Sequence, residues 1–230
     1  MLQALVTGAN RGLGLEMTRQ LLARGARVVA ACRQPGKALA LTRLAGEHPG
    51  RLHVLPLDLA DPRAIAALSR EVGVLDLDIG LLVNNAGVLV EHERFGAIEA
   101  KSLDESFAVN AAGPVLLTQA LNPHLADGAR VVNLSSTLGS IARTDSLYSP
   151  SYAISKAALN MATRLLAIAL DGHGIVVVAL CPGWVRTDMG GAGAPLAPAD
   201  AVARMLRVID RLGDADSGSF LTHDGEPIPW

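Results

Sequence analysis

A tyrosine and a lysine four residues apart, Tyr152 and Lys156, are the residues of this sequence best suited to acid–base chemistry. On a helix, positions four apart lie on one face, roughly 6 Å apart along the axis, so the two side chains would project together. A phenol with a pKa of about 10 is a poor acid–base catalyst at neutral pH, and an adjacent ammonium lowers that pKa. We therefore predict that Tyr152 exchanges a proton with an oxygen of a bound molecule.

The residues around this pair indicate where on the helix it lies. Pro150 and Ser151 are typical of a helix start, which places Tyr152 in the first turn, near the mouth of a site. Tyr148 is the only other tyrosine of the chain, and it precedes the helix. It is either a wall of a substrate pocket or a packed loop residue, and the sequence leaves both open.

Short apolar runs alternate with helical patterns along the whole chain. Such runs are typical of strands buried on both faces of a parallel sheet, and they cover 2–6, 26–31, 52–57, 79–85, 129–135 and 174–181, with an edge strand possible at 218–225. Helices are predicted at about 13–24, 37–46, 62–73, 100–122, 151–170 and 198–212, and 186–198 is a long irregular loop. This alternation predicts one α/β domain over residues 1–230, a Rossmann-type doubly wound parallel sheet with helices on both faces.

A glycine-rich stretch, TGANRGLG, lies between the first predicted strand and the first predicted helix. Its three glycines allow a tight turn, a close approach of the backbone to a ligand and close packing of the helix. The free N–H groups of the helix start suit a pyrophosphate, although the spacing differs from GxGxxG and a turn without a ligand is the alternative. The candidate pyrophosphate site consists of Gly8, Asn10, Arg11, Gly12, Leu13 and Gly14.

The residues after the second predicted strand bear on the choice between NAD(H) and NADP(H). An NAD site usually has an acid there for the ribose 2′-hydroxyl, but none occurs in CRQPGK. Arg33 and Arg11 would instead suit a 2′-phosphate through charge-assisted hydrogen bonds, unless they are solvated surface charges. We therefore predict a preference for NADP(H). Asp58, followed by Leu59, would accept from the adenine amino group or cap the next helix, although Asp61 suits the cap better.

Composition narrows the class of protein. Half of the residues are hydrophobic and 18% are charged, which is too apolar for a disordered chain. A net charge of −2 gives no basic surface for nucleic acid or an anionic membrane. The apolar run at the N-terminus is too short for a signal peptide, and Cys32 and Cys181 have no metal-ligand spacing. We expect a cytoplasmic protein with reduced thiols, no metal site and no membrane span.

Taken together, the motifs resemble those of the classical short-chain dehydrogenase/reductase family. TGANRGLG, NNAG, Asn110, NLSS, the Tyr152–Lys156 pair and PGWVRT follow one another in the order of that family. Within it, the chain is most similar to the C-factor and sniffer-type carbonyl reductases, on the basis of CRQP, SKAALNM, PGWVRTDMGG and DGEPIPW. The resemblance implies the same Rossmann-type fold and a nicotinamide cofactor.

The resemblance also implies a role for each motif residue. Ser136 would hydrogen-bond the substrate oxygen, with Ser135 as the near alternative. Asn110 would hold a water in a proton relay from Lys156, or make a buried structural hydrogen bond. Asn84 would border the cofactor or brace neighbouring strands. The further cofactor residues are Ala86, Gly87, Pro182, Gly183, Val185 and Thr187, with Tyr152 and Lys156 at the nicotinamide ribose. The positive nicotinamide of an oxidised cofactor would then lower the pKa of Tyr152 together with the ammonium of Lys156. The expected walls of the substrate pocket are Leu89, Tyr148 and Trp184.

We therefore expect an NADPH-preferring carbonyl reductase that transfers hydride between the nicotinamide and a small carbonyl or alcohol substrate, with Tyr152 as general acid or base. The alternative is a dinucleotide-binding regulatory or signalling protein with little or no turnover on the same fold. The presence of a proton donor and a relay favours catalysis. The predicted helices at 103–122 and 152–170 are apolar on most faces, which predicts a homodimer or homotetramer.

Overall fold

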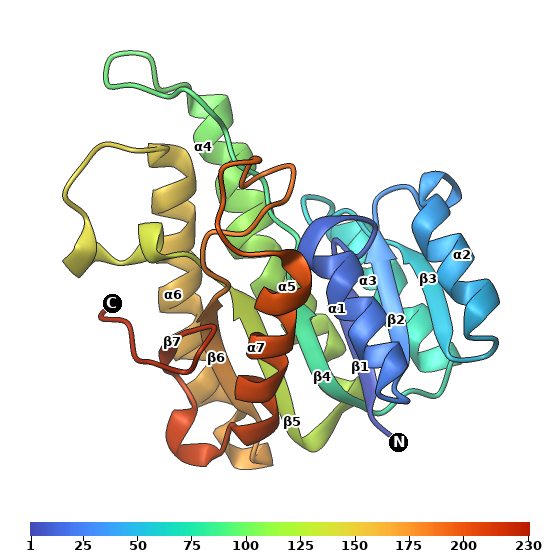
Figure 1. The fold of residues 1–230 in the computed structure, drawn as a ribbon. Coiled ribbons are helices and arrows are strands. Elements are labelled where there is room, and N and C mark those ends of the chain that lie inside the picture. The colour runs from blue at the N-terminus through green and yellow to red at the C-terminus, as the bar shows by residue number, and fades with distance from the viewer.

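Seven parallel strands form the centre of the computed structural model, which describes residues 1–230 (Figure 1). They are β1 (Gln3–Thr7), β2 (Arg27–Cys32), β3 (Leu52–Pro56), β4 (Ile79–Asn84), β5 (Leu125–Leu134), β6 (Val176–Cys181) and β7 (Phe220–Thr222). They pair in the order β3-β2-β1-β4-β5-β6-β7. The order changes direction between β1 and β4, and open α/β sheets bind ligands at such a point, outside the carboxyl ends of the strands.

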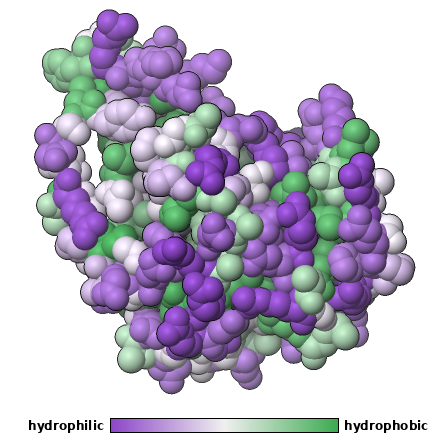
Figure 2. Space-filling view, in the orientation of Figure 1, coloured by the Kyte–Doolittle hydropathy of each residue, from purple (hydrophilic) through white to green (hydrophobic).

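Helices cover both faces of the sheet. The first face carries α1 (Gly12–Ala23), α2 (Leu39–Glu47) and α7 (Pro198–Arg211), and the second carries α3 (Pro62–Val74), α5 (Gly113–Leu121) and α6 (Pro150–Leu170). Side chains alternate along each strand, so Val6 packs with the first group of helices and its neighbour Leu5 with the second. Both faces of the strands are therefore apolar, and the predicted Rossmann-type domain is confirmed. The outer side of the first layer of helices is mainly hydrophilic (Figure 2).

The largest differences between the predicted and the observed elements concern β5 and the predicted helix at 100–122. Strand β5 begins at Leu125, before the predicted start at residue 129. The predicted helix at 100–122 is interrupted, because a π-helical turn, Ala108–Ala112, separates α4 (Ala100–Phe107) from α5. Pro114 has no N–H to donate to the carbonyl of Asn110, which favours a widened turn at this point.

Helix α6 with its continuation to His173 is long and apolar enough to span a membrane by length and composition alone. Its position explains this composition differently. One side packs against the sheet and buries polar residues that bond to it, among them Lys156, Asn160 and Thr163. This is the pattern of a helix that covers one face of the sheet in an α/β domain.

Candidate active site

A crevice of about 900 Å³ lies at the carboxyl ends of the strands. It is lined by the segments that follow β1, β2, β3, β4, β5 and β6 and by the start of α6. The structure therefore brings together residues that are far apart in the sequence. The predicted cofactor residues that line the crevice are Gly8, Asn10, Arg11, Gly12, Leu13, Arg33, Asp58, Leu59, Ala86, Gly87, Tyr152, Lys156, Pro182 and Thr187.

The glycine turn fits a pyrophosphate. Gly8 has a φ of +63°, and a Cβ there would approach the Cα of Ala86 to 2.9 Å, so only glycine fits this turn. The Thr7 hydroxyl accepts hydrogen bonds from the backbone N–H groups of Asn85 and Ala86, both at 3.0 Å, which holds the turn against the end of β4. Helix α1 then begins without any side-chain cap. Its free N–H groups lie at the crevice and can bind an anion.

Four predicted cofactor residues do not line the crevice. Gly14 lies behind the turn, where a Cβ would approach the carbonyl oxygen of Gly8 to 2.4 Å, so its role is close packing of α1. Asn84 is 2% exposed, and its amide donates to Asn133 Oδ1 at 2.8 Å. Of the two roles that the sequence left open for Asn84, this bond supports the bracing of neighbouring strands. Gly183 and Val185 are also outside the lining of the crevice, and Val185 is buried.

Asn85 lines the crevice in place of Asn84. Its amide donates to the carbonyl oxygens of Thr7, at 2.7 Å, and Gly8, at 3.3 Å, and so stabilises the glycine turn. The sequence analysis missed Asn85, although NNAG contains two asparagines. On a strand, neighbouring side chains point to opposite faces, so only one of the two could brace the sheet.

The two arginines proposed for the 2′-phosphate both line the crevice, but their surroundings differ. Arg33 is exposed and makes no ion pair or side-chain hydrogen bond. Arg11 forms an exposed ion pair with Asp188, from the loop after β6, at 2.8 Å. Sequence reasoning gave no role to Asp188. The Asp58 carboxylate accepts from the N–H of Ala60 at 3.0 Å, and Asp61 caps α3, as expected.

Tyr152 and Lys156 lie together on α6, as predicted. The ammonium nitrogen of Lys156 is 5.5 Å from the centre of the Tyr152 ring, and it donates to the carbonyl oxygen of Leu134 at 2.6 Å. Lys156 is 4% exposed. Burial lowers the pKa of Lys156 to about 8, and the nearby Cys181 opposes this effect.

In the protein alone, the pKa of Tyr152 is raised rather than lowered. Burial raises this pKa, the nearby Cys181 adds to the rise, and a side-chain hydrogen bond with Ser136 opposes it. Desolvation therefore outweighs any effect of the neighbouring ammonium in the protein alone. At neutral pH the phenol remains protonated, which is the form that can donate a proton to a carbonyl oxygen.

The two serines after β5 have different partners. The hydroxyl of Ser135 is buried and donates to Asn160 Oδ1 at 2.7 Å. Although Ser135 borders the crevice, its hydroxyl is thus engaged away from Tyr152. Ser136 is outside the lining of the crevice; its hydroxyl accepts from the N–H of Leu138 at 3.2 Å, and it lies near enough to Tyr152 to oppose the rise of the phenol pKa. Because the hydroxyl of Ser135 is already engaged by Asn160, Ser136 stays the candidate for contact with a substrate oxygen.

Asn110 lies in the π-helical turn and is fully buried. Its amide accepts from the N–H of Val88 and donates to the carbonyl oxygen of the same residue, both at 2.8 Å. It also donates to the hydroxyl of Ser155 at 2.9 Å, next to Lys156. These bonds compensate for an asparagine inside a helix. Because they occupy the side chain, a proton relay at Asn110 would have to use its backbone carbonyl.

Glu93 is a second residue that sequence reasoning missed. Helix α6 begins after Ser149, which has a φ of +44° and makes no side-chain cap. The carboxylate of Glu93 instead accepts from the N–H of Ser151 at 3.1 Å and from its hydroxyl. A carboxylate at a helix N-terminus is stabilising, and this one fixes the turn that carries Tyr152. No local pattern links Glu93 to a helix so much later in the chain.

None of the three predicted substrate residues lines the crevice. Tyr148 is 62% exposed in the loop before α6, and Trp184 is 60% exposed with its indole N–H donating to the carbonyl oxygen of Gly190 at 2.8 Å. Leu89 is half-buried outside the lining. The apolar lining near Tyr152 comes instead from residues that the sequence analysis did not select, Val88, Val109 and Met189.

Lys156→Met should stabilise the protein more at about pH 7 than at about pH 10. The lysine has a pKa of about 8 when folded, below its ordinary 10.5, so the cost of burying its charge is fully present below the folded pKa. That cost disappears as the pH rises from the folded-state pKa to the ordinary pKa of lysine. A pKa shift of this size corresponds to on the order of 3 kcal/mol in the free energy of unfolding. Thermal unfolding across this pH range measures it. Lys101→Met, at an exposed position, is the control, and a Lys156→Met effect that does not vary with pH would contradict the prediction.

Comparison with known proteins agrees with this geometry. The sequence matches the short chain dehydrogenase family over residues 3–194. C-signal of Myxococcus xanthus is 42% identical over 154 residues, which is 66% of this chain and 93% of that protein. The structure of carbonyl reductase Sniffer of D. melanogaster has a TM-score of 0.95 at 33% identity, with 100% of both chains covered. That of NADPH-bound carbonyl reductase from chicken fatty liver has a TM-score of 0.93 at 39% identity, with 99% of this chain and 98% of that one covered. The chain thus belongs to the short chain dehydrogenase family and shares the fold of its carbonyl reductases.

Proposed function

We propose that this protein is an NADPH-preferring carbonyl reductase in which Tyr152 is the general acid. The observation that carries the proposal is the protonated Tyr152 phenol at the crevice, with Ser136 near enough to oppose the rise of its pKa and with the buried ammonium of Lys156 beside it. The similarity to carbonyl reductases, one of them NADPH-bound, supports it. The small-molecule substrate is a ketone or an aldehyde, or an alcohol in the reverse direction.

The residues of the chain orient the substrate and move the proton. The nicotinamide, when bound, supplies or accepts the hydride. Ser136 donates a hydrogen bond to the carbonyl oxygen and so holds it beside Tyr152. Tyr152 transfers its phenolic proton to this oxygen as negative charge develops there. The positive charge of Lys156 then stabilises the tyrosinate left behind, which it does not achieve against desolvation in the resting site.

Tyr152→Phe should lower kcat by about 10²–10⁴-fold, the usual contribution of a positioned general acid. Binding of NADPH should change little, because the glycine turn and Arg33 are unaltered. The decrease of nicotinamide absorbance with a panel of aldehydes, ketones and quinones measures kcat, and fluorescence titration measures binding.

Tyr148→Phe is the matched control, since it removes the same hydroxyl from an exposed position outside the crevice. It should leave kcat within a few fold of wild type. If Tyr152→Phe still reduced carbonyl compounds at a rate close to that of wild type, the proton would have to come from another group.

The preference for NADPH is proposed to depend on Arg33. Its guanidinium lines the crevice after β2 and has no protein partner, so it is free to bind a 2′-phosphate. Hydrogen bonds to charged groups contribute roughly 1.5–3 kcal/mol each. Arg33→Ala should therefore raise the Kd for NADPH by about tenfold or more and leave that for NADH nearly unchanged.

Lys37→Ala provides the control for this measurement. It removes the same charge from an exposed position near the crevice but outside its lining. If both variants weaken the binding of NADPH equally, the effect comes from net charge and not from a specific contact. Tighter binding of NADH than of NADPH by wild type would overturn the proposed preference itself.

A signalling protein with little turnover is the second candidate function. The similarity to C-signal, at 42% identity, is the observation that favours it. Tyr152, Ser136 and Lys156 argue for catalysis, because a sensor has no need for a proton donor in its crevice. Tight NADPH binding without turnover of any compound in the panel would favour the signalling function.

The two cysteines agree with a location in the cytoplasm. Cys32 and Cys181 are both buried free thiols on different strands. Unpaired thiols are typical of proteins in reducing compartments. We propose the cytoplasm as the place where the protein acts.

We also propose that the protein forms a homodimer or homotetramer through α6. Four large apolar residues on this helix share one exposed stripe at helical spacing, Ile154, Met161, Leu165 and Ile168. Phe107 and Leu116, from α4 and α5, are exposed as well. Leu117, Leu121 and Leu159, on the same predicted helices, are instead buried in the monomer and cannot take part.

Met161→Glu should shift the protein toward the monomer, because it places a charge in the middle of the stripe. Sedimentation equilibrium measures the mass in solution. The control is Val74→Glu, at an exposed apolar residue at the end of α3. Wild-type protein that is monomeric at all concentrations would contradict the proposal.

A further inference from the structure

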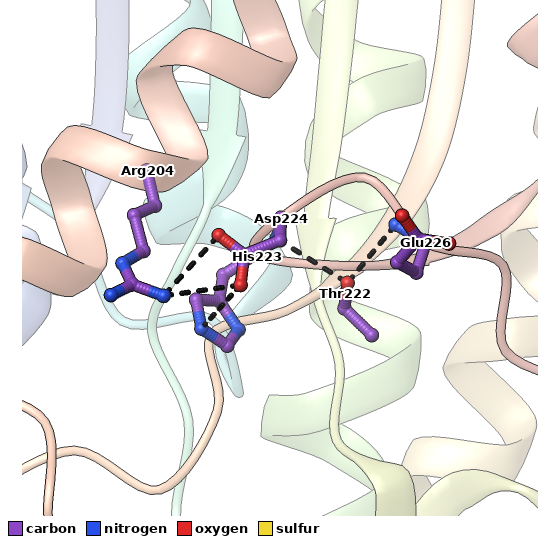
Figure 3. Close-up of polar contacts among 5 residues, drawn as sticks. All are labelled: Arg204, Thr222, His223, Asp224 and Glu226. Carbon is purple, nitrogen blue, oxygen red and sulfur yellow. Dashed lines mark hydrogen bonds and ion pairs between the residues drawn. The ribbon is translucent and has the colours of Figure 1, made fainter.

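The chain folds back on itself after the edge strand β7. A tight turn follows Thr222, whose N–H donates to the carbonyl oxygen of Glu226 at 2.8 Å. The hydroxyl of Thr222 accepts from the N–H of Glu226 at 3.1 Å (Figure 3). Asp224 in this turn forms an ion pair with Arg204 of α7 at 3.1 Å. The turn is thereby tied to a helix of the core, and the residues beyond it, 226–230, start from a fixed point. We call residues 226–230 the strap.

The strap runs beside β7 and is held there at Ile228 and Trp230. The N–H of Ile228 donates to the carbonyl oxygen of Phe220 at 2.7 Å, and Ile228 is 4% exposed. The indole ring of Trp230 stacks on the ring of Phe220, with centroids 5.5 Å apart and planes 23° apart. Phe220 is itself buried against Cys181 at the end of β6. Stacked aromatic pairs contribute beyond their buried area, so the strap is firmly seated.

The end of the strap holds the segment that follows Ser136. The hydroxyl of Ser140 donates to the carbonyl oxygen of Pro229 at 2.6 Å. The N–H of Ala142 donates to the carbonyl oxygen of Trp230 at 2.9 Å. Ser140 is fully buried although every residue from 141 to 148 is exposed. The strap therefore supplies the anchor on the outer side of this segment.

The inner side of the same segment touches the catalytic helix. The carbonyl oxygen of Gly139 accepts from the amide of Asn160 at 3.0 Å. A Cβ at Gly139 would lie 2.8 Å from the Cβ of Lys156, so the two backbones are in close contact. Ser136 is only three residues before Gly139, and its carbonyl oxygen accepts from the N–H of Gly139 at 2.8 Å. A shift at Ser140 is thus passed to Gly139 and Ser136.

We propose that Trp230, Pro229 and Ser140 are positioning residues that hold Ser136 at the correct distance from Tyr152. The inference rests on the proposed carbonyl reductase function, in which Ser136 orients the substrate oxygen. The strap acts through the segment between Ser136 and Ser140 and touches neither substrate nor cofactor. Its contribution concerns turnover, because the residues that bind the adenine end of the dinucleotide follow β1, β2 and β3, and the strap contacts none of them.

Ser140→Ala and Trp230→Ala test this proposal in the full-length protein. A misplacement of about 1 Å can cost about 10²-fold in rate, so kcat should fall by about 10–100-fold in each variant. The Kd for NADPH should stay within about twofold of wild type. Ser69→Ala is the matched control, because it removes a similar hydroxyl-to-carbonyl bond, of 2.7 Å to Ala120, far from the crevice. An unchanged kcat in both test variants would overturn the proposal.

A double-mutant cycle separates positioning from general destabilisation. In a Ser136→Ala background, Ser140→Ala should cause little further loss of kcat, because the two substitutions affect the same contact. If the decrease of kcat in the double variant equalled the product of the decreases in the two single variants, the proposed route through Ser136 would be overturned.

Amide hydrogen exchange gives a readout that needs no turnover. Ser140→Ala and Trp230→Ala should both increase amide exchange in residues 137–144 and leave exchange in the central strands β1 and β4 as in wild type. Unchanged exchange in residues 137–144 would overturn the proposal that the strap holds this segment, even if catalysis were impaired. If wild type reduces no carbonyl compound, the proposed function fails, and exchange alone then decides whether the strap holds this segment.

Discussion

The burial of one ammonium group is the constraint on which the rest of the site depends. An ion taken out of water costs several kcal/mol, and the only hydrogen bond of the Lys156 ammonium to the protein is to the carbonyl of Leu134. Helix α6 must therefore lie at one height and one rotation relative to the end of β5. Glycine at position 139 permits the close approach, the Asn160 amide ties α6 to the same segment, and Glu93 fixes the beginning of the helix. The position of Tyr152 follows from that of Lys156.

The two halves of the crevice are built in different ways. Over β1 and β4, the surface offered to a ligand is backbone: a turn with positive φ at Gly8 and the free N–H groups of α1. Near α6 the surface consists of side chains whose protonation depends on burial, as the shifts of Tyr152 and Lys156 illustrate. The first half requires the absence of side chains and the second requires exact types of side chain. Substitution by alanine therefore disturbs them for opposite reasons.

The elements of the fold could be predicted because their signals are local. Apolar runs located six strands, and the Tyr152–Lys156 spacing placed both side chains on one helix face, as the structure confirms. What escaped prediction depends on partners distant in the sequence. The Glu93 carboxylate reaches a helix start 58 residues later, and Arg11 pairs with a residue 177 positions away. Asn84 and Asn85 could not be told apart because the choice depends on which side of β4 faces α5. The raised pKa of Tyr152 in the protein alone also escaped prediction, because the extent of its burial cannot be read from spacing.

The ion pair between Arg11 and Asp188 has a consequence for how a phosphorylated ligand enters the crevice. Both residues line it, and both are largely exposed, so the pair is accessible to solvent and ions. The carboxylate of Asp188 is held by one nitrogen of the Arg11 guanidinium, and the other donors are open. An anion that bound the same nitrogen would exchange one counterion for another rather than neutralise a free charge. The loop after β6 would then lose this ion pair with the glycine turn.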